Sequence, residues 1–281
     1  MLEGWWELFA AALGGGATAK VAEIAYNESR DWIRERRSTA KTISNNLEPL
    51  LKATDELVGK LRSLAEQDFL PTRKADKALS DSEFASLLFL FVQFWAWLEV
   101  FRVQSFNHDV GKSGTGRQLM AFLDCLESRR VRIVDRISQR AIGECALSDG
   151  TPINFVEFVI KAESDTYVQR WVSPLTAFLG ELDGAEQRQR LLRYGVVLHA
   201  LIDTLDKSHG ITKARPATPN KLTKRSWRDL EYRVFGVYLQ FVRDRSKYIG
   251  PPKGGPDTVG GAHTACCRCT AFSSLPALSL S

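Results

Sequence analysis

The sequence FASLLFLFVQFWAWL, residues 84–98, holds no charged residue, and its large apolar side chains would cover every side of a helix. Such a helix lies either at the centre of a bundle or in a membrane. At about 1.5 Å per residue the run spans about 22 Å, which is shorter than the roughly 30 Å hydrocarbon core of a bilayer. Extending the run brings in Glu99 and Arg102. We therefore predict a buried central helix from Phe84 to Val103, with a membrane span as the alternative.

Apolar residues recur at helical spacing through most of the remaining chain, whereas the alternation typical of strands is scarce. Start signals repeat as well, since Thr151-Pro152 and Ser173-Pro174 each place a hydroxyl side chain before a proline that could open a helix. Further helices are expected at about residues 118–147, 153–162, 166–171, 174–182, 185–207 and 224–248. The predicted fold class is all-α, a multi-helix bundle with an N-terminal helical arm and a disordered C-terminal tail.

Composition divides the chain into four predicted parts. Residues 1–42 form an aromatic and basic helical arm, residues 43–78 a short heptad helix and linker, residues 79–249 the helical bundle, and residues 250–281 a disordered tail rich in Gly, Pro and Ser. No internal repeat with a period of 20 to 50 residues is evident.

The heptad helix is predicted from apolar residues that alternate steps of three and four, as in a coiled coil. These residues are Leu47, Leu50, Thr54, Leu57, Leu61 and Leu64. Because the seam is under three heptads long, a hairpin or bundle helix is favoured over an autonomous coiled coil. Asn46 is the predicted N-cap of this helix, and Ser80 with Glu83 predicts a capping box at the start of the next.

Composition excludes several classes of protein. The chain has 281 residues, 44% hydrophobic and 25% charged, so it can bury a core and is not collagen-like, disulfide-dense or wholly disordered. Cys125 and Cys145 stand singly in helical patterns and the other three cysteines fall within residues 266–269, which favours a reducing, cytoplasmic location. Residues 1–9 carry two acids and no base, so no secretory signal is expected.

Positive charge is concentrated between Lys207 and Arg228, a segment with seven basic residues and no acid. Pro216 and Pro219 predict an exposed loop leading into a helix, where phosphate oxygens or anionic lipid head groups could be held. The alternative is a solvated loop whose charge only keeps the protein soluble. The predicted anion-binding residues are Lys213, Arg215, Lys221, Lys224, Arg225 and Arg228. Nucleic-acid binding is not favoured, because Trp227 is the only aromatic residue in the segment.

The N-terminal arm presents a second candidate surface. Trp5, Trp6, Phe9 and Leu13 share one side of a predicted short helix. Tryptophan suits a membrane–water interface because its ring is apolar while its N–H stays hydrated. The alternative is that this face docks onto the bundle, and the lack of a basic polar face favours that alternative. We predict that these four residues contact a membrane or a partner.

A buried charge is predicted within the helix expected at residues 118–147. Arg130 falls on the apolar side of that helix with Leu126 and Ile137, and Glu144 lies close to the same side. A buried guanidinium needs a partner, so an ion pair between Arg130 and a carboxylate is expected, with a structural role.

One candidate metal site lies on the helix expected at residues 185–207. His199 and Asp203 stand four residues apart, and Asp206 follows one turn later, so the three could bind a divalent ion from one side. The alternative is a set of ordinary polar residues flanking an apolar stripe. The tail residues His263 to Cys269 could bind metal opportunistically, but a single segment does not make a structural zinc site.

These features predict a non-catalytic helical interaction or regulatory protein. We expect it in the cytoplasm, and the alternative location is the surface of a membrane. It would meet a protein partner, or a second copy, through its N-terminal helices and an anionic surface through the basic loop. A peripheral membrane protein and a metal-dependent hydrolase using His199, Asp203 and Asp206 are the alternatives. No cofactor and no small-molecule substrate are inferred.

Overall fold

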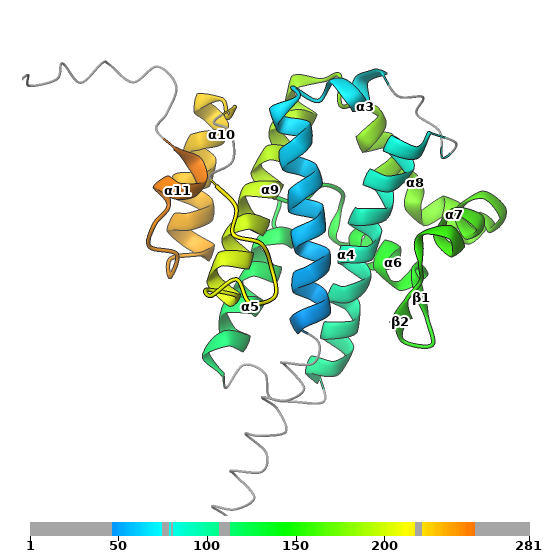
Figure 1. Ribbon diagram of the computed structural model, residues 1–281, viewed down its shortest axis with the longest axis horizontal. Helices are drawn as coiled ribbons and strands as arrows, with labels where there is room; N and C mark the ends of the chain where they lie inside the picture. The colour runs from blue at the N-terminus through cyan, green and yellow to red at the C-terminus, as the bar shows by residue number, and fades with distance from the viewer. Residues whose placement is uncertain (1–46, 75–78, 80, 107–112, 217–220, 251–281) are drawn as a thin grey trace, which may run out of the picture.

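The computed structural model describes residues 47–74, 79, 81–106, 113–216 and 221–250, and these are mostly helical (Figure 1). After a helix over residues 47–66, the elements in chain order are α3 (Leu70–Lys74), α4 (Ser82–Phe106), α5 (Gly114–Glu127), α6 (Arg136–Cys145), the short strands β1 (Leu147–Ser148) and β2 (Thr151–Pro152), α7 (Phe155–Ser164), α8 (Thr166–Gly180), α9 (Ala185–Leu205), α10 (Lys224–Arg228), the π-helix η2 (Asp229–Tyr238) and α11 (Ser246–Ile249). The predicted all-α class is confirmed. The predictions for Trp5, Trp6, Phe9, Leu13, Asn46 and residues 251–281 lie outside the described residues.

Helix α4 contains the uncharged run and forms much of the core. By length and composition alone, the segment Ser82–Val103 could cross a membrane. However, 72% of its most apolar stretch is buried inside the protein. It packs against α6, α7, α8 and β2. Phe91, Phe94 and Trp95 are each 1% exposed or less. These neighbours cover the apolar surface of α4 as expected for the central helix of a bundle.

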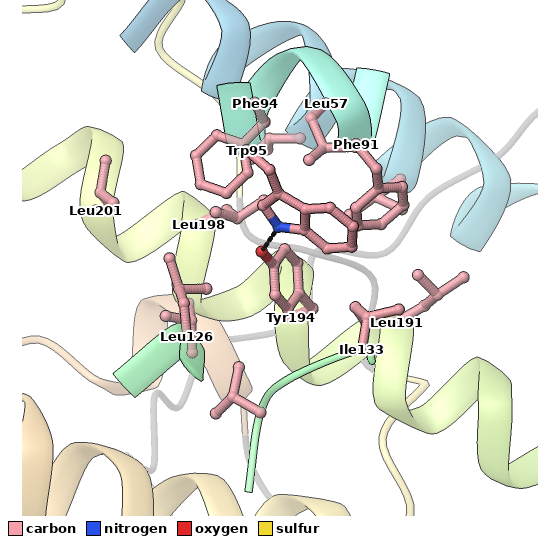
Figure 2. Close-up of a cluster of buried hydrophobic side chains, with 14 of the residues drawn as sticks. Leu57, Phe91, Phe94, Trp95, Leu126, Ile133, Leu191, Tyr194, Leu198 and Leu201 are labelled. Atoms are coloured by element: carbon pink, nitrogen blue, oxygen red, sulfur yellow. Dashed lines mark hydrogen bonds between the residues drawn. The ribbon is translucent and has the colours of Figure 1, made fainter. Parts of the chain in front are cut away.

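A single polar pair lies at the centre of the aromatic cluster drawn in Figure 2. The Trp95 Nε1–H donates a hydrogen bond of 2.8 Å to the hydroxyl oxygen of Tyr194 on α9. The rings of Phe91 and Phe94 pack on Tyr194 at centroid distances of 5.7 and 6.4 Å. Burial raises the pKa of Tyr194, so its hydroxyl stays neutral. The hydrogen bond fixes the register between α4 and α9 while satisfying the indole N–H.

The heptad seam is buried in this same core. Leu50, Leu57, Leu61 and Leu64 are at most 5% exposed and belong to one cluster with residues of α4 and α9. Thr54, in the middle of the seam, donates its hydroxyl proton to the carbonyl oxygen of Leu50 at 2.6 Å. Residues 47–66 therefore form an internal helix of the bundle, and their apolar seam is covered by the chain itself.

The helix expected at residues 118–147 is broken. Helix α5 ends at Glu127, and α6 begins only at Arg136. Asp135 caps α6, because its Oδ1 accepts hydrogen bonds of 3.0 Å from the backbone N–H groups of Ile137 and Ser138. The continuous prediction was wrong because an N-cap aspartate can start a new helix inside a pattern that otherwise reads as one.

Other boundaries differ for local reasons. Asp81 caps α4 by accepting hydrogen bonds from the N–H groups of Glu83 and Phe84, whereas Ser80, the predicted cap, lies outside the described residues. Thr151-Pro152 forms a strand of a small hairpin, and Asn154 caps α7 instead. The two helices expected at residues 166–182 are one, α8, with Pro174 inside it. The helix expected at residues 224–248 turns into a π-helix at Asp229 and leaves the helical path at Leu239.

Candidate functional site

The segment after α9 is held firmly before it enters the helix of residues 224–238. The Gln189 amide of α9 bonds both to the carbonyl of Lys221 at 2.9 Å and to the N–H of Thr223 at 2.9 Å. Thr223 then caps α10 by accepting from the N–H of Ser226 at 3.3 Å. The helix that follows has a fixed position on the bundle because its entry is bonded to α9.

A basic pocket lies along this helix and against the loop between α5 and α6. It is a surface depression of about 650 Å³, and seven of the described residues line it. These are Arg130, Lys224, Arg225, Arg228, Asp229, Tyr232 and Arg233. All five basic residues are exposed. The depression thus gathers cations from two segments that are far apart in the sequence.

Among the described residues that line the basic pocket, the one carboxylate, Asp229, is already paired. Asp229 lies 3.4 Å from Arg193 of α9 and 3.7 Å from Arg233. Arg193 is mostly buried, and burial lowers the pKa of its guanidinium, which the nearby Asp229 raises again. Among the described residues, no carboxylate pairs with Arg130, Arg225 or Arg228. Their positive charge therefore faces solvent without an ion-pair partner in the part of the chain that the structure describes.

Three of the six predicted anion-binding residues line the basic pocket, namely Lys224, Arg225 and Arg228. The other three do not. Arg215 Nε lies 2.8 Å from Asp55 Oδ1 and Lys221 Nζ 3.3 Å from Asp68 Oδ1, so both fasten the loop to the first part of the bundle. Lys213 is exposed outside the pocket. The carboxylate partners of Arg215 and Lys221 lie 160 and 153 residues earlier in the chain, so the sequence did not indicate these ion pairs, and anion binding by the two residues stays a prediction.

The predicted buried charges at Arg130 and Glu144 are also corrected, since both side chains are exposed. Because α5 ends at Glu127, Arg130 no longer continues the apolar side of that helix and instead lines the basic pocket. Ile137, which was expected on the same buried side, is 71% exposed.

The buried ion pairs of the bundle involve other residues. Arg102 of α4 contacts both Glu99 and Glu127, and each of the three side chains is at most 13% exposed. Glu127 also accepts from Arg140 at 3.1 Å and pairs with Arg136 at 2.6 Å. Burial raises the pKa of Glu99 to about 7, although Arg102 opposes the change. The sequence signal was the pair Glu99 and Arg102 at the end of an uncharged helix.

The predicted metal ligands are only partly brought together. His199 Nε2 lies 3.7 Å from Asp203 Oδ2 on α9. Asp206 turns away and caps the following loop, where its carboxylate accepts from the N–H groups of Gly210, Ile211 and Thr212 at 2.8 to 3.0 Å. Within the described ranges no group of three or more His, Cys, Asp or Glu side chains is arranged to hold a metal ion.

Asp203 instead joins α9 to α11. Lys247 forms an ion pair with its Oδ2, and the Tyr248 hydroxyl donates to the same oxygen at 3.1 Å. His209 Nε2 lies 3.6 Å from Oδ1 on the other side of the carboxylate. We call Asp203 with these neighbours and His199 the Asp203 cluster. Sequence reasoning missed His209, Lys247 and Tyr248, because only folding brings the loop and α11 to Asp203.

His199 lies deepest in the Asp203 cluster, with 2% of its side chain exposed. Burial lowers the pKa of its imidazole, and Lys247, Arg62 and Arg215 lower it further, whereas Asp203 raises it. The ring makes an edge contact with Tyr248 at a centroid distance of 5.3 Å. His199 is therefore held neutral in the folded protein at pH 7 and acts as a packing group.

We expect the protein to lose stability through His199 below pH 6.5. The unfolded chain takes up a proton there that the folded chain binds less readily, because the folded pKa is lowered. The loss is at most about 1.4 kcal/mol for each pH unit. His199→Phe keeps an aromatic ring against Tyr248 and removes the titration, so its unfolding free energy in urea should fall less between pH 7 and pH 5.5.

The comparison with the unchanged protein isolates this effect. Glu99, whose pKa is raised to about 7, stabilises the fold as the pH falls toward 4.5, but it does so equally in both proteins. An identical pH dependence for the His199→Phe variant would show that His199 does not titrate as described.

Comparison of the chain with family models, with curated proteins and with solved structures found no match. The basic pocket and the Asp203 cluster both gather charged side chains from separate segments of the chain. Of the two, the Asp203 cluster is closed by its own ion pair and hydrogen bond, whereas the basic pocket is open to solvent.

Proposed function

We propose that this protein is a non-catalytic helical interaction protein that binds a ligand with clustered phosphate groups in the basic pocket. The observation that carries the proposal is the convergence of five exposed basic side chains around a single, already paired carboxylate. Four of the five are arginines, whose planar guanidinium groups suit bidentate binding of phosphate oxygens. A solvated basic loop would not need cations from two separate segments.

The geometry favours clustered phosphates over a single carboxylate. A depression of about 650 Å³ has room for several oxygens at once, and one carboxylate would satisfy few of the donors. The π-helix that carries Asp229, Tyr232 and Arg233 supports a functional role, because this geometry is rare and often occurs at functional sites. Such phosphates could belong to a soluble molecule or to a phosphoinositide head group, which share this chemistry.

Calorimetric titration of the full chain with tripolyphosphate tests the proposal. The unchanged protein should bind, and Arg225→Gln combined with Arg228→Gln should weaken binding at least about 100-fold, because each lost charged hydrogen bond contributes about 1.5–3 kcal/mol. The matched control is Lys207→Gln with Lys213→Gln, which removes the same charge from exposed positions outside the pocket. Binding should also weaken with salt. Equal losses in the two double variants would refute a defined site.

Vesicle co-sedimentation separates the two sources of phosphate. Neutral vesicles with and without a phosphoinositide are compared, each in the presence and absence of competing tripolyphosphate. Binding that requires the phosphoinositide, is displaced by tripolyphosphate and is lost with Arg225→Gln and Arg228→Gln would assign a membrane head group. Tripolyphosphate binding without vesicle binding would assign a soluble ligand.

A further inference from the structure

An exposed aromatic ring stands at the edge of the basic pocket. Tyr232 of η2 is 64% exposed, and its ring makes an edge-to-face contact with the Trp227 ring at a centroid distance of 6.2 Å and an interplanar angle of 83°. Trp227 is itself held, because its Nε1–H donates to the carbonyl of Gly250 at 2.7 Å. The Tyr232 ring is thus supported from one side while much of its surface stays open to solvent.

The π-helix explains why the Tyr232 ring lies beside the basic side chains of the pocket. In an α-helix, residues five positions apart point about 140° away from each other. A π-helix bonds residue i to residue i+5, so such residues lie on nearly the same face. The pairs Trp227 with Tyr232 and Arg228 with Arg233 are both five apart, and each joins a residue at the end of α10 to one in η2. Both Tyr232 and Arg233 line the basic pocket. The altered helix therefore combines an aromatic platform with a phosphate site.

Tyr232 also lines a second depression, which we call the neighbouring depression. It too measures about 650 Å³, and it lies between η2 and the segment that leads to α11. Its lining is mixed, with Trp227 and Val242 beside polar groups that include Gln240 and Asp244. Such a lining has apolar surface, hydrogen-bond donors and acceptors, whereas the basic pocket is dominated by cations. Tyr232 is the residue that the two depressions share.

Resting on the proposed function, we infer that the ligand is a nucleotide, with its polyphosphate in the basic pocket and its base stacked on Tyr232. Every nucleobase has a flat π-face that stacks on an aromatic side chain, and stacking of this kind tolerates different bases. The edge of the base would then face the donors and acceptors of the neighbouring depression. A mononucleotide fits better than a nucleic-acid strand, because a strand requires successive platforms and a groove that follows its backbone.

Affinities of the full chain for ATP and for tripolyphosphate, both measured without metal ions, test the inference. Both probes carry three phosphates, but only ATP carries a base. ATP should bind about tenfold or more tightly than tripolyphosphate, in line with the contribution of one stacked base. Tyr232→Ala should bring the ratio of the two affinities close to one, whereas Tyr232→Phe should keep the ratio. Tyr167→Ala is the control, since Tyr167 is 74% exposed on α8 and lines neither depression.

The outcomes separate this inference from the function on which it rests. Equal affinities for both probes, unchanged by Tyr232→Ala, would overturn the nucleotide and leave the phosphate site standing. No binding of either probe would overturn both. Tighter binding of a single-stranded oligonucleotide than of ATP would overturn the mononucleotide in favour of a nucleic acid. A thermal unfolding scan of Tyr232→Ala verifies that the fold is intact, as expected for an exposed side chain.

Discussion

Replacing Arg102 with methionine is expected to lower the free energy of unfolding by about 3 kcal/mol. The guanidinium lies between Glu99 and Glu127, and its loss leaves two buried carboxylates with less compensation. The effect should fall at the lower end of what breaking a buried ion pair causes. Glu127 keeps Arg136 and Arg140 as partners, and Glu99, whose pKa is already raised to about 7, can take up a proton. Urea unfolding at pH 8 measures the change.

Arg129→Met is the matched control for this prediction. Arg129 is exposed, so the same substitution there should change the free energy of unfolding by less than about 0.5 kcal/mol. Adding Glu99→Gln to Arg102→Met should recover part of the loss, because it removes one uncompensated carboxylate. If Arg102→Met were as mild as Arg129→Met, the buried charges of α4 would not contribute as described.

Gly143→Ala is expected to destabilise the protein by about 1–3 kcal/mol, although alanine is normally favoured over glycine inside a helix. Gly143 lies where α6 crosses α4, and a Cβ atom there would stand 2.7 Å from the carbonyl oxygen of Trp95. Backbone atoms cannot rotate away as a flexible side chain can, so the two helices would have to separate. That movement would disturb the Trp95 hydrogen bond to Tyr194 at the centre of the core. Thermal and urea unfolding both measure the loss.

Gly195→Ala provides a close comparison, since Gly195 is also a buried glycine inside a helix. A Cβ atom at Gly195 would meet Leu61 at 3.5 Å, which is an ordinary packing distance. This variant should be neutral or stabilised by up to about 1 kcal/mol. If both alanine variants behaved alike, close approach of α6 to α4 would not be what requires glycine at position 143.

The helical architecture could be predicted from the sequence because it depends on the periodic spacing of apolar residues. The uncharged run at residues 84–98 predicts a buried helix, and α4 has that position in the described bundle. The leucine seam of residues 47–66 was equally clear, but periodicity does not say what covers an apolar face. Here the bundle covers it, so the seam is buried against the chain's own core and is not exposed to a partner.

Only some residues of the candidate site could be predicted from the sequence. Lys224, Arg225 and Arg228 follow from the run of basic residues, whereas the pairing of Arg215 with Asp55 depends on a contact between distant segments. Arg130 was singled out, but its position depends on where α5 ends. A pattern of charges shows which residues are cationic, and the fold determines which of them find a carboxylate.

Tyr232 and Arg233 were missed for a different reason. Helical patterns are read at 3.6 residues per turn, and at that period Tyr232 does not align with Trp227. The π-helix changes the period for one segment, so side chains five apart come together. No residue type in this stretch marks that change, and the aromatic platform becomes visible only in three dimensions.

A crystal structure of the full chain grown with tripolyphosphate would show whether the basic pocket binds clustered phosphates. We expect the anion in the basic pocket, with phosphate oxygens within about 3 Å of the guanidinium groups of Arg225, Arg228 and Arg130. A tripolyphosphate bound only at another surface, or an empty basic pocket at a concentration that saturates binding in solution, would contradict it.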